Sequence, residues 1–261
     1  MKLPFSKFFC LDRKFLLLVF LRRDLTIKYR RSVLGYVWTM LIPLAQVFIF
    51  FFVYRLVLKI QIPHYLSFIV SGLFPWVYFT AAINDSLDSL VAGRHLILHA
   101  PVPIHVFPAA SNAINFINFL PSVPIIFLVT WYDTGLTPSW HWLLYIPLSL
   151  MLVVFTYSLS FLLACFYVYL RDIKHLIGIV IQLMLYVTPI LYSADMVPEQ
   201  FRWVTTINPL SGYFQSVRHI LFQQSLPEPM PLAAFTAWTL AFLLMADWVR
   251  GAYGFKLVEK I

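Results

Sequence analysis

The sequence is poor in charge and in cysteine. Only 11% of its 261 residues are Asp, Glu, Lys or Arg, whereas soluble domains carry about 25%. So few charged side chains cannot cover a water-facing surface, which argues against a soluble protein. The two cysteines, Cys10 and Cys165, lie far apart and outside any motif, so we interpret them as small apolar packing residues.

Several motifs that carry chemistry are also missing. None of the eight glycines is followed by lysine, so the chain has no G-x-x-x-x-G-K-[ST] loop with which to bind ATP. H-E-x-x-H and C-x-x-C are absent, and we expect no metal ion or other cofactor in this chain. No Asp or Glu lies in the middle of an apolar run, which disfavours a carrier driven by protons or sodium.

Apolar side chains are abundant instead, at 61% of all residues. They gather in six runs close to the length of a membrane-crossing helix, about 17–25 residues. These runs are 36–58, 65–83, 106–131, 143–169, 176–192 and 232–250. Pro108, Pro121 and Pro124 predict that the third helix is kinked or broken. The chain is therefore predicted to be an all-α integral membrane protein that forms a single domain over residues 1–261.

Two further segments are predicted to lie at the membrane surface. Residues 11–32 place leucines at helical spacing with basic residues off that stripe, which predicts an amphipathic interface helix. Residues 193–231 contain two short apolar stripes separated by Asn208-Pro209. We interpret these as short re-entrant helices between the fifth and sixth spans, tucked back into the outer leaflet, with an ordinary amphipathic surface loop as the alternative.

The distribution of Lys and Arg predicts the orientation. With six crossings, both termini share a side, and 15 Lys/Arg fall on that side, nine of them before residue 35. Only Arg55, Lys59, Arg202 and Arg218 fall on the other side. Because cytoplasmic loops are enriched in Lys and Arg, both termini are predicted to be cytoplasmic. The net charge of +8 does not indicate nucleic acid, since the basic residues flank apolar spans.

Polar and aromatic residues within the spans leave two interpretations open. Asn112, Asn115 and Asn118 recur every third residue in the third span. They either join neighbouring helices by hydrogen bonds or line a path for a hydroxyl-rich substrate. Aromatic residues make up 18% of the chain; they either face lipid and the membrane interface or offer flat surfaces along which sugars slide.

An ordered set of short motifs resembles the permease subunits of ABC-2-type exporters. The set begins with Arg23-Asp24-Leu25, Tyr29-Arg30, Leu34-Gly35-Tyr36, Trp38 and Pro43. It continues with Arg171-Asp172-Ile173-Lys174-His175, Thr188-Pro189-Ile190-Leu191-Tyr192, Asn208-Pro209 and Arg218. The similarity covers nearly the whole chain, and within the family it is greatest to polysaccharide exporters, particularly O-antigen permeases and their capsule and teichoic-acid relatives.

The resemblance implies a function and a set of partners. The chain would be the permease subunit of an ATP-driven transporter that exports a lipid-linked, O-antigen-type polysaccharide across the bacterial inner membrane. It would pair with a second copy of itself and with two separate ATP-binding subunits that hold ATP and Mg²⁺, amid membrane lipids. Alternatives are a capsule, teichoic-acid, other lipid or drug cargo, and a membrane-embedded glycosyl- or acyltransferase. An enzyme would need clustered acid and base groups, and the spaced pair Asp85 and Asp88 is more typical of a solvated helix face.

Three groups of candidate residues accompany this resemblance. The candidates for the substrate path are Tyr36, Trp38, Phe50, Tyr54, Asn112, Asn115, Tyr186 and Tyr192. The candidates for binding the diphosphate head of the lipid carrier are Arg22, Arg23, Lys28, Arg30 and Arg31, which could instead serve topology and anionic-lipid contact. The candidates for coupling to the ATPase are Arg13, Asp85, Asp88, Arg94, Arg171, Asp172 and Lys174.

Overall fold

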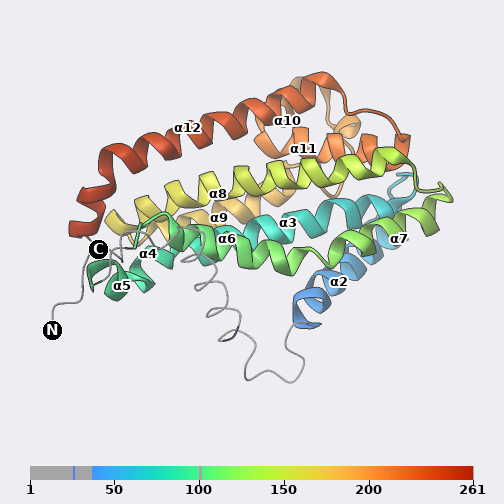
Figure 1. The fold of residues 1–261 in the computed structure, drawn as a ribbon. Helices are drawn as coiled ribbons and strands as arrows, with labels where there is room; N and C mark the ends of the chain where they lie inside the picture. The colour runs from blue at the N-terminus through green and yellow to red at the C-terminus, as the bar shows by residue number, and fades with distance from the viewer. Residues whose placement is uncertain (1–25, 27–36, 100–101, 261) are drawn as a thin grey trace.

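The structure is a computed structural model that describes residues 26, 37–99 and 102–260 (Figure 1). The described residues are helical and contain no strand. Five of their helical segments are long and apolar enough to cross a membrane: Trp38–Val57, Tyr65–Leu87, Val106–Thr134, Trp140–Tyr169 and Pro229–Tyr253. Apart from Thr26, the predicted interface helix 11–32 lies outside the described residues, and so do the candidates Arg13, Arg22, Arg23, Lys28, Arg30, Arg31 and Tyr36.

The α-helices follow one another along the chain with short 3-10 and π-helical turns between them. The α-helices are α2 (Trp38–Phe51), α3 (Tyr65–Leu87), α4 (Ser89–Ala92), α5 (Arg94–His99), α6 (Val106–Phe119), α7 (Ser122–Thr134), α8 (Tyr145–Tyr169), α9 (Ile173–Val187), α10 (Arg202–Ile207), α11 (Pro209–Arg218) and α12 (Pro229–Lys260). The π-helical segments are Phe52–Val57 and His219–Gln223, and the 3-10 segments are Trp140–Leu144, Ala194–Met196 and Glu199–Phe201.

Helix α3 forms the centre of the bundle. In its membrane-crossing stretch 78% of the residues are buried, against 11% in that of α2. Ring contacts join α3 to its neighbours: Phe79 stacks on Phe155 of α8 with centroids 6.1 Å apart, and Phe155 meets Phe235 of α12 at 5.5 Å. Each such pair contributes about 0.5–1.5 kcal/mol beyond the area it buries. These contacts fix α3, α8 and α12 as the rigid part of the fold.

The third span is divided where its prolines predict a break. Helix α6 ends at Phe119 and α7 begins at Ser122, with Leu120 and Pro121 as a turn between them. Pro121 has no N–H to continue the hydrogen-bond ladder. At the far end of α7, Asp133 Oδ2 accepts hydrogen bonds from the backbone N (3.0 Å) and Oγ (2.7 Å) of Ser67 in the first turn of α3. A carboxylate at that point accepts a hydrogen bond from an otherwise unpaired N–H of α3. Its negative charge also interacts favourably with the positive N-terminal end of the helix dipole.

Helix α9 differs from the predicted fifth span. It covers Ile173–Val187, whereas the sequence predicted 176–192. Thr188 is extended, with φ −80° and ψ 134°, because Pro189 excludes the helical conformation from the residue before it. Tyr192 therefore lies in the turn beyond the helix. With 15 residues, α9 is a shorter apolar helix than the five candidate spans.

The segment 193–231 contains two short α-helices, α10 and α11, and packs partly within the bundle, while its predicted place in the outer leaflet stays a prediction. Its second helix, α11, is buried along most of its length, and Tyr213 and Phe214 are 0% and 2% exposed. Phe235 of α12 contacts Tyr213 with ring centroids 5.5 Å apart. Asn208 starts α11, since its side-chain oxygen accepts a hydrogen bond from Leu210 N at 3.0 Å. Part of this segment is therefore core, while α10 is mostly exposed.

The remaining helix limits extend beyond those predicted from the apolar runs. Helix α3 continues to Leu87 rather than 83, a 3-10 turn from Trp140 precedes α8, and α12 covers Pro229–Lys260 rather than 232–250. By contrast, the first span, from Trp38 to Val57, stays within its predicted limits and changes from α to π geometry at Phe52. Hydropathy marks where a helix leaves the apolar layer, but the backbone ladder of α12 continues beyond the ion pair of Asp247 and Arg250 as far as Lys260.

The two ends of the bundle differ in what they carry. Helices α4 and α5 and the end of α12 lie together at one end, and α10 and α11 lie toward the other (Figure 1). We call the first the α4–α5 end. The turn between α8 and α9 belongs to this end as well, because Lys174 pairs there with Asp88.

Candidate functional site

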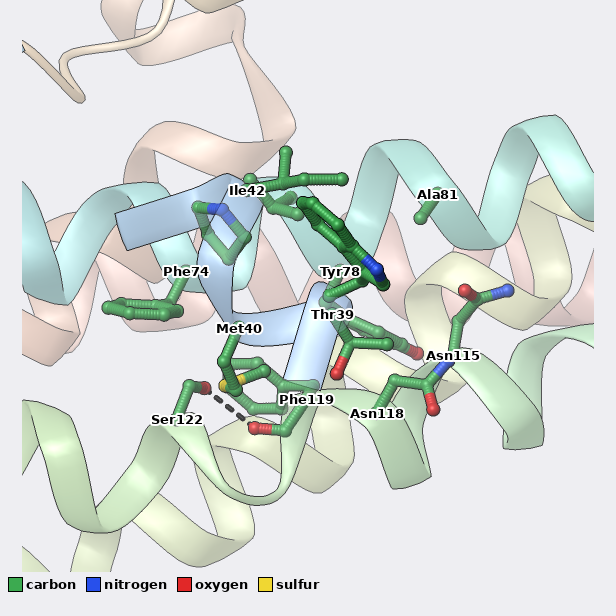
Figure 2. A pocket seen from close by; sticks show the side chains of 13 residues that line it. Thr39, Met40, Ile42, Phe74, Tyr78, Ala81, Asn115, Asn118, Phe119 and Ser122 are labelled. Carbon is green, nitrogen blue, oxygen red and sulfur yellow. Dashed lines mark hydrogen bonds between the residues drawn. The ribbon is translucent and has the colours of Figure 1, made fainter. Parts of the chain in front are cut away.

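A cavity of about 480 Å³ lies between α2, α3, α6 and the start of α7; we call it the inter-helix cavity (Figure 2). Its volume falls in the range of small-molecule sites, about 300–1,000 Å³. It is lined by Trp38, Thr39, Met40, Ile42, Pro43, Phe74, Val77, Tyr78, Ala81, Asn115, Asn118, Phe119 and Ser122. The cavity reaches the surface of the bundle, where Trp38 is 46% and Ile42 55% exposed.

The lining of the inter-helix cavity is divided into a polar and an apolar part. The side chains of Thr39, Tyr78, Asn115 and Asn118 gather toward the part of α3 that leads to the α4–α5 end, while Ile42 and Phe74 lie away from it (Figure 2). None of the lining side chains is charged at neutral pH. The cavity therefore suits an uncharged molecule that has a polar and an apolar part.

The three regularly spaced asparagines of α6 have different surroundings. Asn112 is buried; it accepts a hydrogen bond from Tyr78 Oη and donates to the Val153 carbonyl of α8 at 3.1 Å. Asn115 donates from Nδ2 to Asp85 Oδ2 at 2.9 Å and lines the cavity. Asn112 and Asn115 thus both join α6 to neighbouring helices, and Asn115 and Asn118 line the cavity. Hydrogen bonding between helices is therefore observed for Asn112 and Asn115, whereas a path for a hydroxyl-rich substrate stays a prediction.

The aromatic path candidates do not form one group. Trp38 lines the inter-helix cavity, and Phe50 lines a second cavity of about 210 Å³ between α2, α3 and α9. Tyr54 lies in the π-helical end of the first span, with its ring 6.5 Å from that of Tyr65. Tyr186 is 55% exposed on α9, and Tyr192 donates to the Val187 carbonyl at 3.0 Å. Trp38 and Asn115 share the inter-helix cavity, whereas Phe50 and Tyr54 form a separate pair with ring centroids 6.2 Å apart. The predicted set is thus divided among several places.

The coupling candidates gather at the α4–α5 end. Lys174, at the start of α9, forms an ion pair with Asp88, which directly follows α3. The side chains of these two residues are 45% and 43% exposed. Asp85 lies one turn earlier on α3 and accepts the hydrogen bond from Asn115. The remaining described candidates, Arg94, Arg171 and Asp172, are exposed at the same end.

Exchanging the charges of the Asp88–Lys174 pair tests whether the pair itself joins α3 to α9. Asp88→Lys alone should lower the thermal unfolding midpoint slightly, because an exposed pair is worth less than about 1 kcal/mol and two lysines repel. The double exchange Asp88→Lys with Lys174→Asp should restore the midpoint. Thermal unfolding of the purified protein in detergent measures this, and a double variant as unstable as the single one would contradict a direct pair.

At the opposite end of the bundle, three side chains hold the turn that follows α9. Arg218 Nη2 donates to the Ile190 carbonyl at 3.1 Å, Tyr65 Oη donates to the Leu191 carbonyl at 2.9 Å, and Asn208 Nδ2 donates to Thr188 Oγ1 at 2.8 Å. We call Tyr65, Asn208 and Arg218 the polar clamp. It joins α3 and α11 to the end of α9 through hydrogen bonds to groups that are themselves buried.

Arg218 is the member of the polar clamp with the most unusual surroundings. Its guanidinium carbon lies 3.6 Å from the centroid of the Phe68 ring, a cation–π contact. Burial lowers the pKa of the Arg218 guanidinium to about 9, which leaves the group charged at neutral pH. Arg218 is part of the family motifs in the sequence, but no role was predicted for it; the available signal was a single arginine within the apolar stripe of α11.

Comparisons with known proteins show which family and which relatives this chain resembles. A family model for the ABC-2 type transporter matches residues 16–222. An O-antigen export system permease protein RfbA of Klebsiella pneumoniae is 36% identical over 242 residues, which cover 92% of this chain and 93% of the relative. A second protein of that name and organism is 34% identical over the same shares. One from Myxococcus xanthus is 28% identical over 248 residues, 94% of this chain and 95% of the relative.

The matched family region begins before the described part of the first span and ends in the π-helical turn after α11. It therefore includes the inter-helix cavity, the Asp88–Lys174 pair and the polar clamp. With this region covering most of the sequence, the chain belongs to the ABC-2 type transporter family.

Proposed function

We propose that this chain is the permease subunit of an ATP-driven exporter that moves a lipid-linked, O-antigen-type polysaccharide across the bacterial inner membrane. The observation that carries the proposal is the 36% identity, over 92% of the chain, to a protein named as an O-antigen export permease. The sequence has no phosphate-binding loop of its own, so the energy would come from a separate ATP-binding subunit that holds ATP and Mg²⁺.

The proposal includes a pair of permease chains and six crossings in each. Helix α9 would be the additional crossing, fifth in order along the chain, and large apolar side chains on it are uncovered: Leu176, Ile179 and Leu183 are 60%, 59% and 59% exposed. The exposed face of α2 is similar, with Phe48 71% exposed. Lipid or a second copy would cover these faces, and two-fold pairing would bring equivalent helices together.

In this arrangement the α4–α5 end faces the cytoplasm, as the distribution of Lys and Arg indicates. The ATP-binding subunits would contact the exposed residues near Arg94, Arg171 and Asp172. The basic segment before the first span would attract the diphosphate of the lipid carrier, because Arg and Lys bind phosphate through charge-assisted hydrogen bonds. The sugars would pass along aromatic rings such as those of Trp38 and Phe50.

Complementation tests the proposed function directly. In a bacterium that makes a lipid-linked O-antigen but lacks its permease, the chain produced with its ATP-binding partner should restore surface polysaccharide. Without the chain, the lipid-linked glycan should accumulate at the inner face of the membrane. Export by the chain alone on an ion gradient, or sugar transfer by the purified chain, would contradict the proposal.

Replacement of Trp38 by alanine should reduce export without disturbing assembly. Loss of an aromatic contact worth about 0.5–1.5 kcal/mol corresponds to a roughly two- to tenfold lower export rate. Leu41→Ala is the matched control, because Leu41 is on the same helix and, like Trp38, is 46% exposed, but does not line the cavity. The measurement is surface polysaccharide at equal amounts of membrane-inserted protein. Equal export by the two variants would remove Trp38 from the path.

A further inference from the structure

We propose that the inter-helix cavity is a binding site for an uncharged amphipathic molecule with a hydroxyl-bearing, sugar-like head and a hydrocarbon tail. This goes beyond the export role, because it assigns a ligand to a cavity within one chain whether or not that ligand is cargo. The volume of about 480 Å³ and the division of the lining into a polar and an apolar part carry the proposal.

The polar part of the cavity offers neutral hydrogen-bonding groups beside an aromatic ring. Asn115 uses Nδ2 to bind Asp85 and the Ser111 carbonyl, both at 2.9 Å. Among the described residues no donor reaches its Oδ1, which lines the cavity with the side chains of Thr39 and Asn118. The indole of Trp38 lies at the edge. Amide and hydroxyl groups beside a flat ring are the combination that binds hydroxyl-rich molecules, since the ring contacts the apolar face of the sugar.

The described lining disfavours an anionic head in the same position. Among the described residues no Lys or Arg lines the cavity, and the carboxylate of Asp85, which binds Asn115, is the charged group linked to it. A phosphate placed there would lose its water without gaining a cation, and burying an unpaired charge is costly. A phospholipid or a lipid diphosphate therefore does not fit with its head in the polar part.

The apolar part of the cavity fits a hydrocarbon chain. Ile42, Pro43 and Phe74 form its walls, and Ile42 is exposed toward the surface of the bundle. A tail that moves from water into this part would gain about 25 cal/mol per Å² of buried apolar surface. A tail that moves there from the membrane gains less, because lipid tails are themselves apolar. Selectivity would therefore come from the polar part, and the tail would set the direction in which the molecule lies.

Protection of a cysteine in the cavity tests the proposal. The full chain, with its ATP-binding partner, is placed in phospholipid nanodiscs in a Cys10→Ala, Cys165→Ala background. Thr39→Cys reports on the polar part. Leu41→Cys is the matched control, because Leu41 is two residues further along α2, is exposed and does not line the cavity. The probes are dodecyl β-glucoside and dodecyl phosphate, which share a tail and differ in head charge. The readout is the rate of labelling by a membrane-permeant maleimide.

Glucoside should slow the labelling of Thr39→Cys about tenfold at about ten times its dissociation constant, while dodecyl phosphate should not, and neither should protect Leu41→Cys. Asn118→Leu, which keeps the volume and removes the amide, should weaken protection. If Thr39→Cys fails to fold, Met40→Cys, which also lines the cavity, takes its place. Equal protection by both probes, or none by glucoside, would overturn the proposal.

A third probe separates two sources of the sugar-like head. Maltotriose has hydroxyls but no tail. Protection by maltotriose equal to that by glucoside would indicate a stretch of glycan, whereas protection by the glucoside alone would indicate a neutral membrane glycolipid. The first outcome would contradict the hydrocarbon tail of the proposed ligand, and the second supports the proposal. The labelling assay does not measure export. If the cysteine is protected but complementation shows no export, the proposed function is contradicted and the proposed binding site is not.

Discussion

Gly212→Ala is expected to destabilise the protein by at least about 2–3 kcal/mol, the cost of forcing extra volume into a packed core. A Cβ at position 212 would lie 2.2 Å from the carbonyl oxygen of Pro231 and 3.1 Å from its carbonyl carbon. These are backbone atoms at the start of α12, so no side chain can rotate away to relieve the contact. Helices α11 and α12 would have to separate along their shared buried face, where Tyr213 meets Phe235.

Thermal unfolding of the purified protein in one detergent measures this effect, supported by the fraction of monodisperse protein after extraction. Gly178→Ala is the matched control. Gly178 lies within α9, and a Cβ there meets no atom within 4 Å, so alanine should be neutral or stabilise the helix by up to about 1 kcal/mol. Equal unfolding midpoints for the two variants would contradict the close approach of α11 and α12.

Arg218→Met should release the turn after α9 and lower both stability and export. The change removes the donor that lies 3.1 Å from the carbonyl of the fully buried Ile190. An unsatisfied buried carbonyl lowers the free energy of unfolding by about 1–3 kcal/mol. The change also removes the contact with Phe68, worth about 0.5–2 kcal/mol. Arg218→Lys should recover only part of the loss. An ammonium group lacks the planar guanidinium that bonds to the Ile190 carbonyl and stacks over the Phe68 ring at the same time.

Arg202→Met is the control for this variant. Arg202 belongs to the same segment, but its side chain is 56% exposed and its contact with Glu199 is 3.5 Å long, so its removal should change stability by less than about 0.5 kcal/mol. Thermal unfolding and surface polysaccharide are measured for both variants. An Arg218→Met protein as stable and active as Arg202→Met would show that the polar clamp does not need its cation.

The sequence predicted those parts of the fold that local patterns determine. The apolar runs located the five candidate spans and the short helix α9, and the prolines located the break between α6 and α7. The predicted helix limits were less accurate where the residue after the helix determines its end. Thr188 is the clearest case, because Pro189 ends α9 five residues before the apolar run ends.

Contacts between distant residues could not be predicted in the same way. Trp38 and Asn115 were both candidates, but only the packing of α2 against α3 and α6 places them in one cavity. The spacing of Asn112 and Asn115 is identical to that of Asn115 and Asn118, yet their surroundings differ. Asn112 binds α8, Asn115 binds Asp85 of α3 and also lines the cavity, and Asn118 lines the cavity. Asp133 lies 66 residues from the Ser67 that it caps, and no local pattern connects them.

Helix α9 is attached to the rest of the bundle mainly at its two ends. The Asp88–Lys174 pair holds its start, the polar clamp holds the turn beyond its end, and most of the helix between them is exposed. Its 15 residues correspond to a rod about 22 Å long. Because a hydrogen-bonded helix resists compression along its axis, a push on Lys174 would move the Thr188–Leu191 turn by a similar distance. Mechanical work done at one end of the bundle would thus reach the other end through a single helix.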